Sequence, residues 1–445
     1  MIQKSFQPKK LLAIRTDHLG DLLLTLPALN LFKERTPTCE LHMVASESYA
    51  AVLRHLSWLK QVWIPSEVDE AFLRQGFDSY LAFWEQEPLN QNSLIQKIPF
   101  RAGYRRGWQR SYLNLALPHQ HIRASYRPQV LQNLDLLAML GFKATLEELP
   151  LITLDHSKAG TAGWRIGICI DTAGSDRRYA LAHINMLTQD ILKKWPQSTV
   201  VLLGTGRSTS QAEELIRAIG PLALRVENLV GKTTVEELLA LCKTLRILVV
   251  GNTGPAHLAA ALDIPQVTLF IAQAPSLTRW GPWSLKARIL KRSPACDFVC
   301  RPPECDQGAR ICELDIHPAQ VLDAIAAVLA QAQQVNSMRE QLTQFAKQGI
   351  AIASSQTQVV ETLRARGWQA HLIPKSKDAA ERLRFLKARQ TLVCVDSGPL
   401  LRWIERLRLS NHVGVLPLYD SFKGDWDVQH FEGCLYRYFG MEELA

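Results

Sequence analysis

Residues 10–29, KLLAIRTDHLGDLLLTLPAL, contain the stretch that decides the fold of this chain. The run Lys10–Arg15 is short and apolar, which predicts a buried strand. A loop over residues 16–20 follows, and leucines then recur at helical spacing over residues 21–35. A strand that passes through a glycine-containing loop into a helix is typical of the first unit of an open α/β sheet.

The same alternation of strand and helix continues outward from this unit. Before residue 150 the sequence predicts further strands at 41–45 and 62–64, and helices at 49–59 and 126–140. Residues 143–164 show no periodicity and are the expected linker. After them, strands are predicted at 165–170, 199–203, 247–250 and 267–270, and helices at 183–194, 211–219, 235–242, 257–262 and 318–331. Such alternation implies parallel sheets with covering helices, here in two separate doubly wound lobes.

The C-terminal tail has the same α/β character. Strands are predicted at 349–353, 371–373 and 392–395, and helices at 359–366 and 379–389. The turn Asp396-Ser-Gly-Pro399 is interpreted as a plain strand-to-helix connection rather than a ligand site. The predicted domains are therefore residues 1–150, 151–335 and 336–445, the last a third compact domain of unknown role.

The composition excludes some classes of protein. The chain has 445 residues, of which 47% are hydrophobic and 21% charged, so disorder should not dominate. Charges interrupt every long apolar stretch, which argues against a membrane span or a signal peptide and makes a cytoplasmic protein the expectation. The net charge of +9 favours an anionic partner: nucleic acid, an anionic membrane surface or a phosphorylated substrate. No nucleic-acid-binding module is visible, so nucleic acid is not the expected partner.

Asp21 stands where the first predicted helix begins, just after Gly20, which is expected to let the backbone turn tightly. Ligands of open α/β sheets bind beyond the carboxyl ends of the strands, so this loop is predicted to face a cleft. The local pattern alone favours a simpler role, in which the Asp21 carboxylate caps the helix.

A second strand–turn–helix unit lies at residues 249–262, VVGNTGPAHLAAAL. Free N–H groups at the helix start, the Thr253 hydroxyl and the absence of a side chain at Gly254 suit a diphosphate. The alternative is an ordinary connection with Pro255 in the first helical turn. The turn Gly204-Thr-Gly206 is weaker evidence still and is predicted to be a simple turn.

The two units together resemble glycosyltransferase family 9, the ADP-heptose:lipopolysaccharide heptosyltransferases, which have the GT-B architecture. That family opens with a strand, a Gly-Asp pair and an LLLTLPAL-like helix, and its second lobe has a DTGP-x-HLAAAL-like segment. The segments Pro265–Phe270 and Arg279–Pro282, and a cysteine loop that ends at Cys312, follow in the family's order. The resemblance covers roughly residues 9–329 and does not reach the tail.

The resemblance implies an inverting, metal-independent sugar transfer from a nucleotide sugar, ADP-heptose above all, to a lipopolysaccharide core or another envelope glycolipid at the inner membrane surface. It makes Asp21 the general base. The donor-binding residues it implies are Thr172, Arg177, Arg178, Gly231, Thr233, Asn252, Thr253, Gly254 and His257. The family usually has aspartate where this chain has Asn252, and a Lys-x-Trp-Pro-like pattern in place of residues 177–180, which leaves the donor less certain than the fold.

Two further clusters have alternative interpretations. The basic stretch with Arg101, Arg105, Arg106 and Arg110 would suit the phosphates and carboxylates of a glycolipid acceptor, or is a solvated loop. The four cysteines of the loop could hold a structural zinc ion, but their irregular spacing favours plain thiols. They are Cys296, Cys300, Cys305 and Cys312. No cofactor beyond the nucleotide sugar is expected.

A non-catalytic GT-B protein that binds nucleotides or acts as a scaffold is the alternative function. Asn252 and the added tail keep this alternative open. The pair Gly20-Asp21 argues against it, because a protein without catalysis has no chemical need for that carboxylate.

Overall fold

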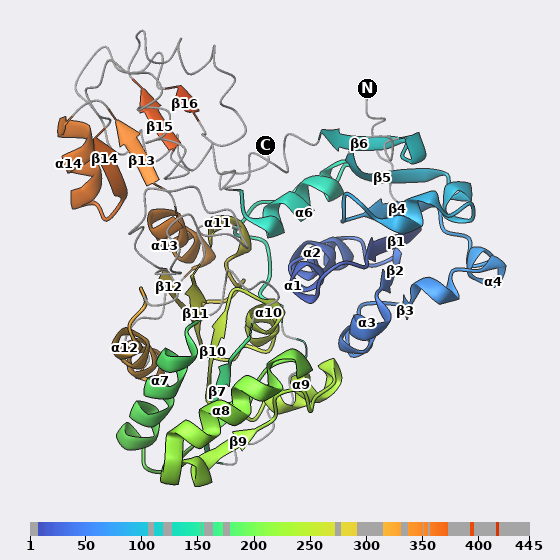
Figure 1. The fold of residues 1–445 in the computed structure, drawn as a ribbon. Coiled ribbons are helices and arrows are strands. Elements are labelled where there is room, and N and C mark those ends of the chain that lie inside the picture. The colour runs from blue at the N-terminus through green and yellow to red at the C-terminus, as the bar shows by residue number, and fades with distance from the viewer. Residues whose placement is uncertain are drawn as a thin grey trace.

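The computed structural model describes residues 8–105, 111–118, 127–152, 154, 163–171, 179–271, 277–291, 315–330, 337–349, 351–354, 357–372, 392–395 and 415–417. Two lobes and a smaller third unit make up this part of the chain (Figure 1). Each is built on a parallel sheet, as the alternation of strand and helix predicts.

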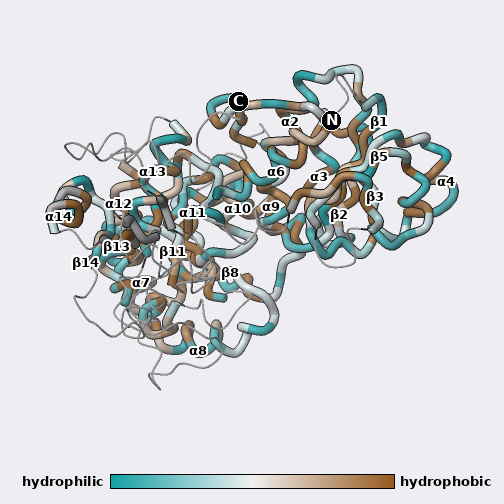
Figure 2. The backbone as a smooth tube through the Cα atoms, turned by 90° about the horizontal axis from the view of Figure 1, so that it is seen from above, coloured by the Kyte–Doolittle hydropathy of each residue, from teal (hydrophilic) through white to brown (hydrophobic). Residues whose placement is uncertain are grey.

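The first lobe contains a six-stranded parallel sheet in the order β3-β2-β1-β4-β5-β6. Its strands are β1 Lys10–Arg15, β2 Glu40–Ala45, β3 Gln61–Trp63, β4 Ser79–Ala82, β5 Phe100–Arg105 and β6 Leu115–Pro118. Its helices are α1 Leu19–Leu23, α2 Leu26–Arg35, α3 Glu47–Leu53, α4 Glu70–Leu73 and α6 Gln129–Ala138, with 3₁₀ turns at Pro65–Glu67, Pro88–Gln91 and Ile95–Lys97. Hydrophobic segments gather along the strands of this sheet, as Figure 2 shows.

The second lobe repeats the same strand order. Its six parallel strands, in the order β12-β11-β10-β7-β8-β9, are β7 Trp164–Cys169, β8 Ser198–Leu203, β9 Val226–Asn228, β10 Ile247–Gly251, β11 Gln266–Phe270 and β12 Ala287–Lys291. The helices are α7 Leu181–Lys194, α8 Thr209–Ile219, α9 Val235–Cys242, α10 Gly254–Ala261, α11 Leu277–Trp280 and α12 Pro318–Leu329, with 3₁₀ turns at Gly206–Ser208 and Gly220–Arg225.

The third unit is a four-stranded parallel sheet in the order β14-β13-β15-β16. Its elements are α13 Met338–Gly349, β13 Ala351–Ser354, α14 Thr357–Ala365, β14 Gln369–Leu372, β15 Leu392–Val395 and β16 Val415–Pro417. The predicted strands of the tail are therefore present, whereas the predicted helix at 379–389 and the turn Asp396–Pro399 lie outside the described residues.

The structure corrects two details of the sequence prediction. The helix expected at residues 21–35 is two helices, α1 and α2, because the chain turns at Leu24 and Thr25 before Pro27, which has no N–H to donate. Strands β4, β5, β6, β9 and β12 show no clear alternation in the sequence and were not predicted. β5 contains the first part of the stretch that was interpreted only as basic.

The expected linker packs against the second lobe. Leu146, Leu149 and Ile152 are buried, the Leu154 N–H donates to the Ala261 carbonyl at 2.9 Å, and the Trp283 indole donates to the Pro150 carbonyl at 2.8 Å. One hydrophobic core cluster joins side chains of both lobes and the third unit, for example Leu22, Leu258 and Phe345. The domain boundary near residue 150 stays a prediction.

Candidate functional site

Two loops that carry candidate residues lie at equivalent places in the two sheets. In the first sheet β1 pairs with both β2 and β4, so the strand order reverses beside β1, and Asp21 follows β1. In the second sheet the order reverses between β7 and β10, and Thr253 follows β10. Open α/β sheets bind ligands beyond the carboxyl ends of their strands at such reversals. Both candidate loops thus occupy the position where a ligand is expected.

The two loops lie against each other, because α1 of the first lobe packs on α10 of the second. A Cβ atom added to Gly254 would lie 3.3 Å from Cβ of Leu19. A Cβ atom added to Gly20 would lie 2.5 Å from Cδ2 of His257. The carboxyl ends of the two sheets therefore meet where Asp21 and Thr253 lie.

Gly20 has a different role from the expected one. The sequence suggests that it permits a tight backbone turn, but Gly20 lies within α1 and is absent from the glycines with positive φ among the described residues. What requires glycine here is the imidazole ring of His257, which occupies the space of a side chain. Gly20 therefore matters for the contact between the lobes rather than for backbone conformation.

We expect Gly20→Ala to lower the free energy of unfolding by about 1–3 kcal/mol, because the new methyl group overlaps the buried His257 ring. Thermal unfolding measures the effect. Gly206→Ala is the matched control, since nothing lies within 4 Å of the Cβ that it would add. Equal stability of Gly20→Ala and the native protein would contradict the close contact between the lobes.

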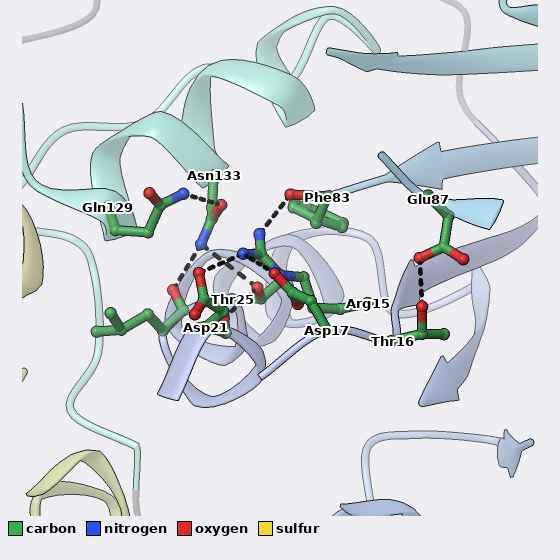
Figure 3. A network of polar contacts seen from close by, with 10 residues as sticks. Arg15, Thr16, Asp17, Asp21, Thr25, Phe83, Glu87, Gln129 and Asn133 are labelled. Carbon is green, nitrogen blue, oxygen red and sulfur yellow. Dashed lines mark hydrogen bonds and ion pairs between the residues drawn. The ribbon is translucent and has the colours of Figure 1, made fainter. Parts of the chain in front are cut away.

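The Asp21 carboxylate is held by Arg15 (Figure 3). Arg15 Nη2 donates to Asp21 Oδ1 at 2.5 Å and to Asp17 Oδ2 at 2.9 Å, while Arg15 Nε donates to Asp17 Oδ1 at 2.6 Å. Arg15 Nη1 donates to the Phe83 carbonyl at the end of β4. One guanidinium group thus joins both carboxylates of the loop to the neighbouring strand.

This geometry contradicts the interpretation of Asp21 as a helix cap. The N-cap residue of α1 is His18, no side chain makes a capping bond there, and the Asp21 side chain contacts Arg15 instead. The Asp21 side chain keeps 15% of its surface exposed, against 4% for Arg15 and 7% for Asp17. Asp21 is therefore the more accessible of the two carboxylates in the cluster.

Burial and charge act against each other in this cluster. Burial raises the pKa of Asp17, an effect that the nearby Arg15 only partly offsets and that the Asp21 charge increases. Burial disfavours the charge of Arg15, but Asp21 and Asp17 more than compensate and its pKa lies above the usual value. The cation of Arg15 is consequently a permanent feature of the site.

A chain of buried amide side chains on α6 connects this loop with the second lobe (Figure 3). Asn133 Nδ2 donates to the Leu24 carbonyl at 2.8 Å, and Gln129 Nε2 donates to Asn133 Oδ1 at 3.0 Å. Arg279 Nε of the second lobe donates to Gln129 Oε1 at 2.9 Å. This chain of hydrogen bonds therefore links the α1–α2 turn of the first lobe to α11 of the second.

Arg279 brings a second guanidinium group toward Asp21. Burial lowers its pKa, and the negative charge of Asp21 acts against this shift. Its guanidinium carbon also lies 4.5 Å from the centre of the Trp280 ring. The sequence alone did not identify four residues of this cluster: Arg15, Gln129, Asn133 and Arg279. Two features of the sequence could have indicated them. Arg15 is a charged residue at the end of a buried strand, and Gln129 and Asn133 are amides four residues apart on an apolar helix.

The start of α10 offers fewer N–H groups than the sequence suggests. Pro255 has none, and the Ala256 N–H donates to the Thr253 carbonyl at 3.0 Å. Asn252 is buried, and Thr253 precedes the helix in extended conformation without a capping bond from its side chain. Of the first three residues of α10, Gly254 is the one whose N–H could bind a phosphate oxygen.

His257 is placed inside the contact between the lobes. Burial lowers its pKa to about 4, so the imidazole is neutral near pH 7, and its Nδ1 has no hydrogen-bond partner in the described part of the chain. A neutral ring cannot balance the charge of a diphosphate. Any cation for that purpose must come from another residue.

Asp171, at the end of β7, organises the neighbouring turn. Its Oδ2 accepts hydrogen bonds from the Thr205 N–H at 2.8 Å, the Thr205 hydroxyl at 2.6 Å and the Ser208 hydroxyl at 3.1 Å. Asp171 thus fixes the turn Gly204-Thr-Gly206, whose role as a simple connection stays a prediction. Gly231 has φ +72° and packs on Gly206, since an added Cβ would lie 2.9 Å from Gly206 Cα. Gly231 and the half-buried Thr233 follow β9 at the same edge of the sheet.

Several predicted residues cannot be placed. Outside the described residues lie the proposed donor contacts Thr172, Arg177 and Arg178, and the basic residues Arg106 and Arg110. The side chain of Arg105 and the cysteines Cys296, Cys300, Cys305 and Cys312 lie there too. Arg101 is described, and its guanidinium donates to the carbonyls of Tyr112 and Ile98 at 2.8 and 2.5 Å.

Within the described ranges, no three His, Cys, Asp or Glu side chains form a possible metal site, and no helix is long and apolar enough to span a membrane.

Part of this chain matches a known protein family. Residues 91–302 match the model of glycosyltransferase family 9 (heptosyltransferase). Over this segment the chain is similar to the heptosyltransferases of that family. Lipopolysaccharide heptosyltransferase 2 of Salmonella typhimurium is 29% identical over 168 residues, which are 37% of this chain and 47% of that protein. Lipopolysaccharide heptosyltransferase 1 of Campylobacter coli is 20% identical over 288 residues, 59% of this chain and 83% of that protein.

Solved structures of the family share the fold. The ADP-heptose lipopolysaccharide heptosyltransferase II of Escherichia coli superposes with a TM-score of 0.60 at 20% identity, over 73% of this chain and 99% of that one. The family 9 protein of Veillonella parvula gives a TM-score of 0.61 at 16% identity, over 73% and 98% of the two chains. The paired parallel sheets are thus the GT-B architecture of family 9. The matched segment spans about half the length of heptosyltransferase 2.

Proposed function

We propose that this chain is an inverting glycosyltransferase that moves heptose or a related sugar from a nucleotide sugar to a lipopolysaccharide core or another envelope glycolipid. One observation carries the proposal. An accessible carboxylate, Asp21, lies at the strand-order reversal of the first sheet and meets the start of α10 at the corresponding reversal of the second. A base and a nucleotide-binding loop are thereby held at one place.

In the proposed reaction Asp21 accepts the proton of the acceptor hydroxyl. The hydroxyl oxygen forms a bond with the anomeric carbon while the bond from that carbon to the diphosphate oxygen breaks. The bonding pair leaves with the diphosphate, whose growing negative charge can be stabilised by the Gly254 N–H and by Arg279. The attack occurs opposite the leaving group, so one base suffices and no covalent intermediate forms.

The donor is proposed to be ADP-heptose. Two solved relatives, with TM-scores of 0.54 and 0.51 and identities of 17% and 19%, are E. coli heptosyltransferase WaaC with ADP and with ADP-2-deoxy-2-fluoro heptose. We place the diphosphate at Thr253 and Gly254, and Thr172, Arg177 and Arg178 are further proposed donor contacts. Gly231 and Thr233 are proposed to line the adenine pocket.

The acceptor is proposed to lie on the first lobe, near the basic stretch that begins in β5. Arg105, Arg106 and Arg110 are the proposed contacts with its phosphates and carboxylates. Arg101 is the weakest member of this group, because its guanidinium already binds two backbone carbonyls.

Replacement of Asn252 tests the donor side of the proposal. Asn252 is buried next to Thr253, so Asn252→Asp brings a carboxylate beside the proposed diphosphate site. If Asn252 contacts the ribose through hydrogen bonds, the affinity for ADP-heptose is kept or raised. If it faces phosphate oxygens, the affinity falls by about tenfold or more. Calorimetry with ADP-heptose and other nucleotide sugars distinguishes these outcomes, and no binding of any donor to either form would overturn the proposal in favour of a scaffold.

A further inference from the structure

A cavity of about 660 Å³ lies on the second lobe, on the side where the third unit packs. Its wall includes β12, the C-terminal end of α12 and one face of α13, the first helix of the third unit. We call it the edge cavity. Its volume is in the range of sites that hold small molecules.

The edge cavity is distinct from the proposed transfer site. Arg246, Pro265 and Lys286 immediately precede β10, β11 and β12, so they mark the amino ends of these strands. Asn252 follows the carboxyl end of β10. A five-residue strand separates the two edges by roughly 16 Å, and a ligand of the edge cavity cannot occupy the Asp21 site at the same time.

Two arginine side chains of the edge cavity have unused hydrogen-bond donors. Arg246 Nε and Arg288 Nη1 are buried, and neither has a hydrogen-bond partner in the described part of the chain. Arg246 also stacks on Trp164, with its guanidinium carbon 4.1 Å from the ring centre. Buried donors without partners are rare in folded proteins and indicate that something else completes them.

The charges around the edge cavity do not cancel. Lys286 is paired with Asp263, with Nζ 2.5 Å from Oδ2, so this cation is already compensated. Neither Arg246 nor Arg288 forms an ion pair with a described residue. An anion that enters the cavity would therefore meet two guanidinium groups whose charge is uncompensated.

The rest of the wall includes both polar and apolar side chains. Gln341, Gln344 and Gln348 recur on one face of α13, and Gln341 Nε2 is anchored by the Ala287 carbonyl at 2.7 Å. Val328, Leu329 and Phe345 supply apolar surface. A ligand with an apolar body and a charged oxygen-rich end could contact both kinds of side chain.

We propose that the edge cavity binds a small soluble anion, a phosphate monoester or a carboxylate with an apolar body. The anionic oxygens accept hydrogen bonds from Arg246 and Arg288, and the body lies against Val328, Leu329 and Phe345. Because α13 forms part of the wall, the ligand contacts the second lobe and the third unit together.

Titration calorimetry with 1-naphthyl phosphate tests the proposal on the full chain. We expect binding that weakens by about tenfold or more in Arg288→Gln, because a charged hydrogen-bond donor is lost. Gln344→Glu should weaken binding similarly, because the added carboxylate repels the anion. Gln344 is exposed, so this substitution should not affect folding. Inorganic phosphate, which lacks the apolar body, should bind more weakly than 1-naphthyl phosphate.

Arg217→Gln on the exposed face of α8 is the matched control and should bind like the native protein. Gln344→Glu keeps the test valid if Arg288→Gln does not fold. No binding of 1-naphthyl phosphate, or binding that neither variant weakens, would overturn the proposal. The result does not depend on sugar transfer, so its failure would leave the role of Asp21 untouched.

Discussion

Replacing Asp21 by asparagine should lower the turnover of sugar transfer by about 10²–10⁴-fold. Asparagine has nearly the same shape as aspartate and can still accept a hydrogen bond from Arg15, but it cannot take the proton of the acceptor hydroxyl. The affinity for the donor should be retained, because the proposed nucleotide contacts lie in the second lobe. Steady-state kinetics and calorimetry on the same preparation measure the two quantities separately.

Asp323→Asn, an exposed substitution on α12, is the control and should leave turnover unchanged. If Asp21 only accepts the hydrogen bond from Arg15 and does not act as a base, Asp21→Asn should remain active, because asparagine can still accept that bond. Full activity of this variant would reject Asp21 as the base and with it the proposed mechanism.

Arg15→Met should lower the free energy of unfolding by about 3–5 kcal/mol. Methionine fills much of the volume of the arginine but leaves the Asp17 and Asp21 carboxylates without their cation, and the Phe83 carbonyl without its donor. Asp17 is the more buried carboxylate, so most of the loss should arise there. Chemical denaturation monitored by circular dichroism measures this loss.

The double variant Arg15→Met with Asp17→Asn identifies the cause. Removing the buried charge of Asp17 should restore part of the stability, because the cost of Arg15→Met comes from an unpaired carboxylate. Arg217→Met, at an exposed position, should cost less than about 0.5 kcal/mol. If the double variant is no more stable than Arg15→Met, the ion cluster is not the source of the loss.

The positions of many elements could be predicted from the sequence. The strand at residues 10–15 and most strands and helices of the second lobe follow from apolar runs and helical spacing, which depend on neighbouring residues alone. The loops around Asp21 and Thr253 were found as strand–turn–helix units, and their expected roles came from the resemblance to glycosyltransferase family 9. Strands β4, β5, β6, β9 and β12 were missed, since short strands with mixed composition have no distinctive local period.

The sequence by itself therefore determined the α/β class, the two lobes and the loops that carry Asp21 and Thr253. Only the tertiary structure decided what surrounds these residues. Gly20 is a glycine because His257 of the other lobe fills its side-chain space, and Asn133 reaches the Leu24 carbonyl across 109 residues of sequence. The physical reason is that helical and strand periods are local, whereas an ion cluster or a contact between lobes exists only after distant segments have packed together.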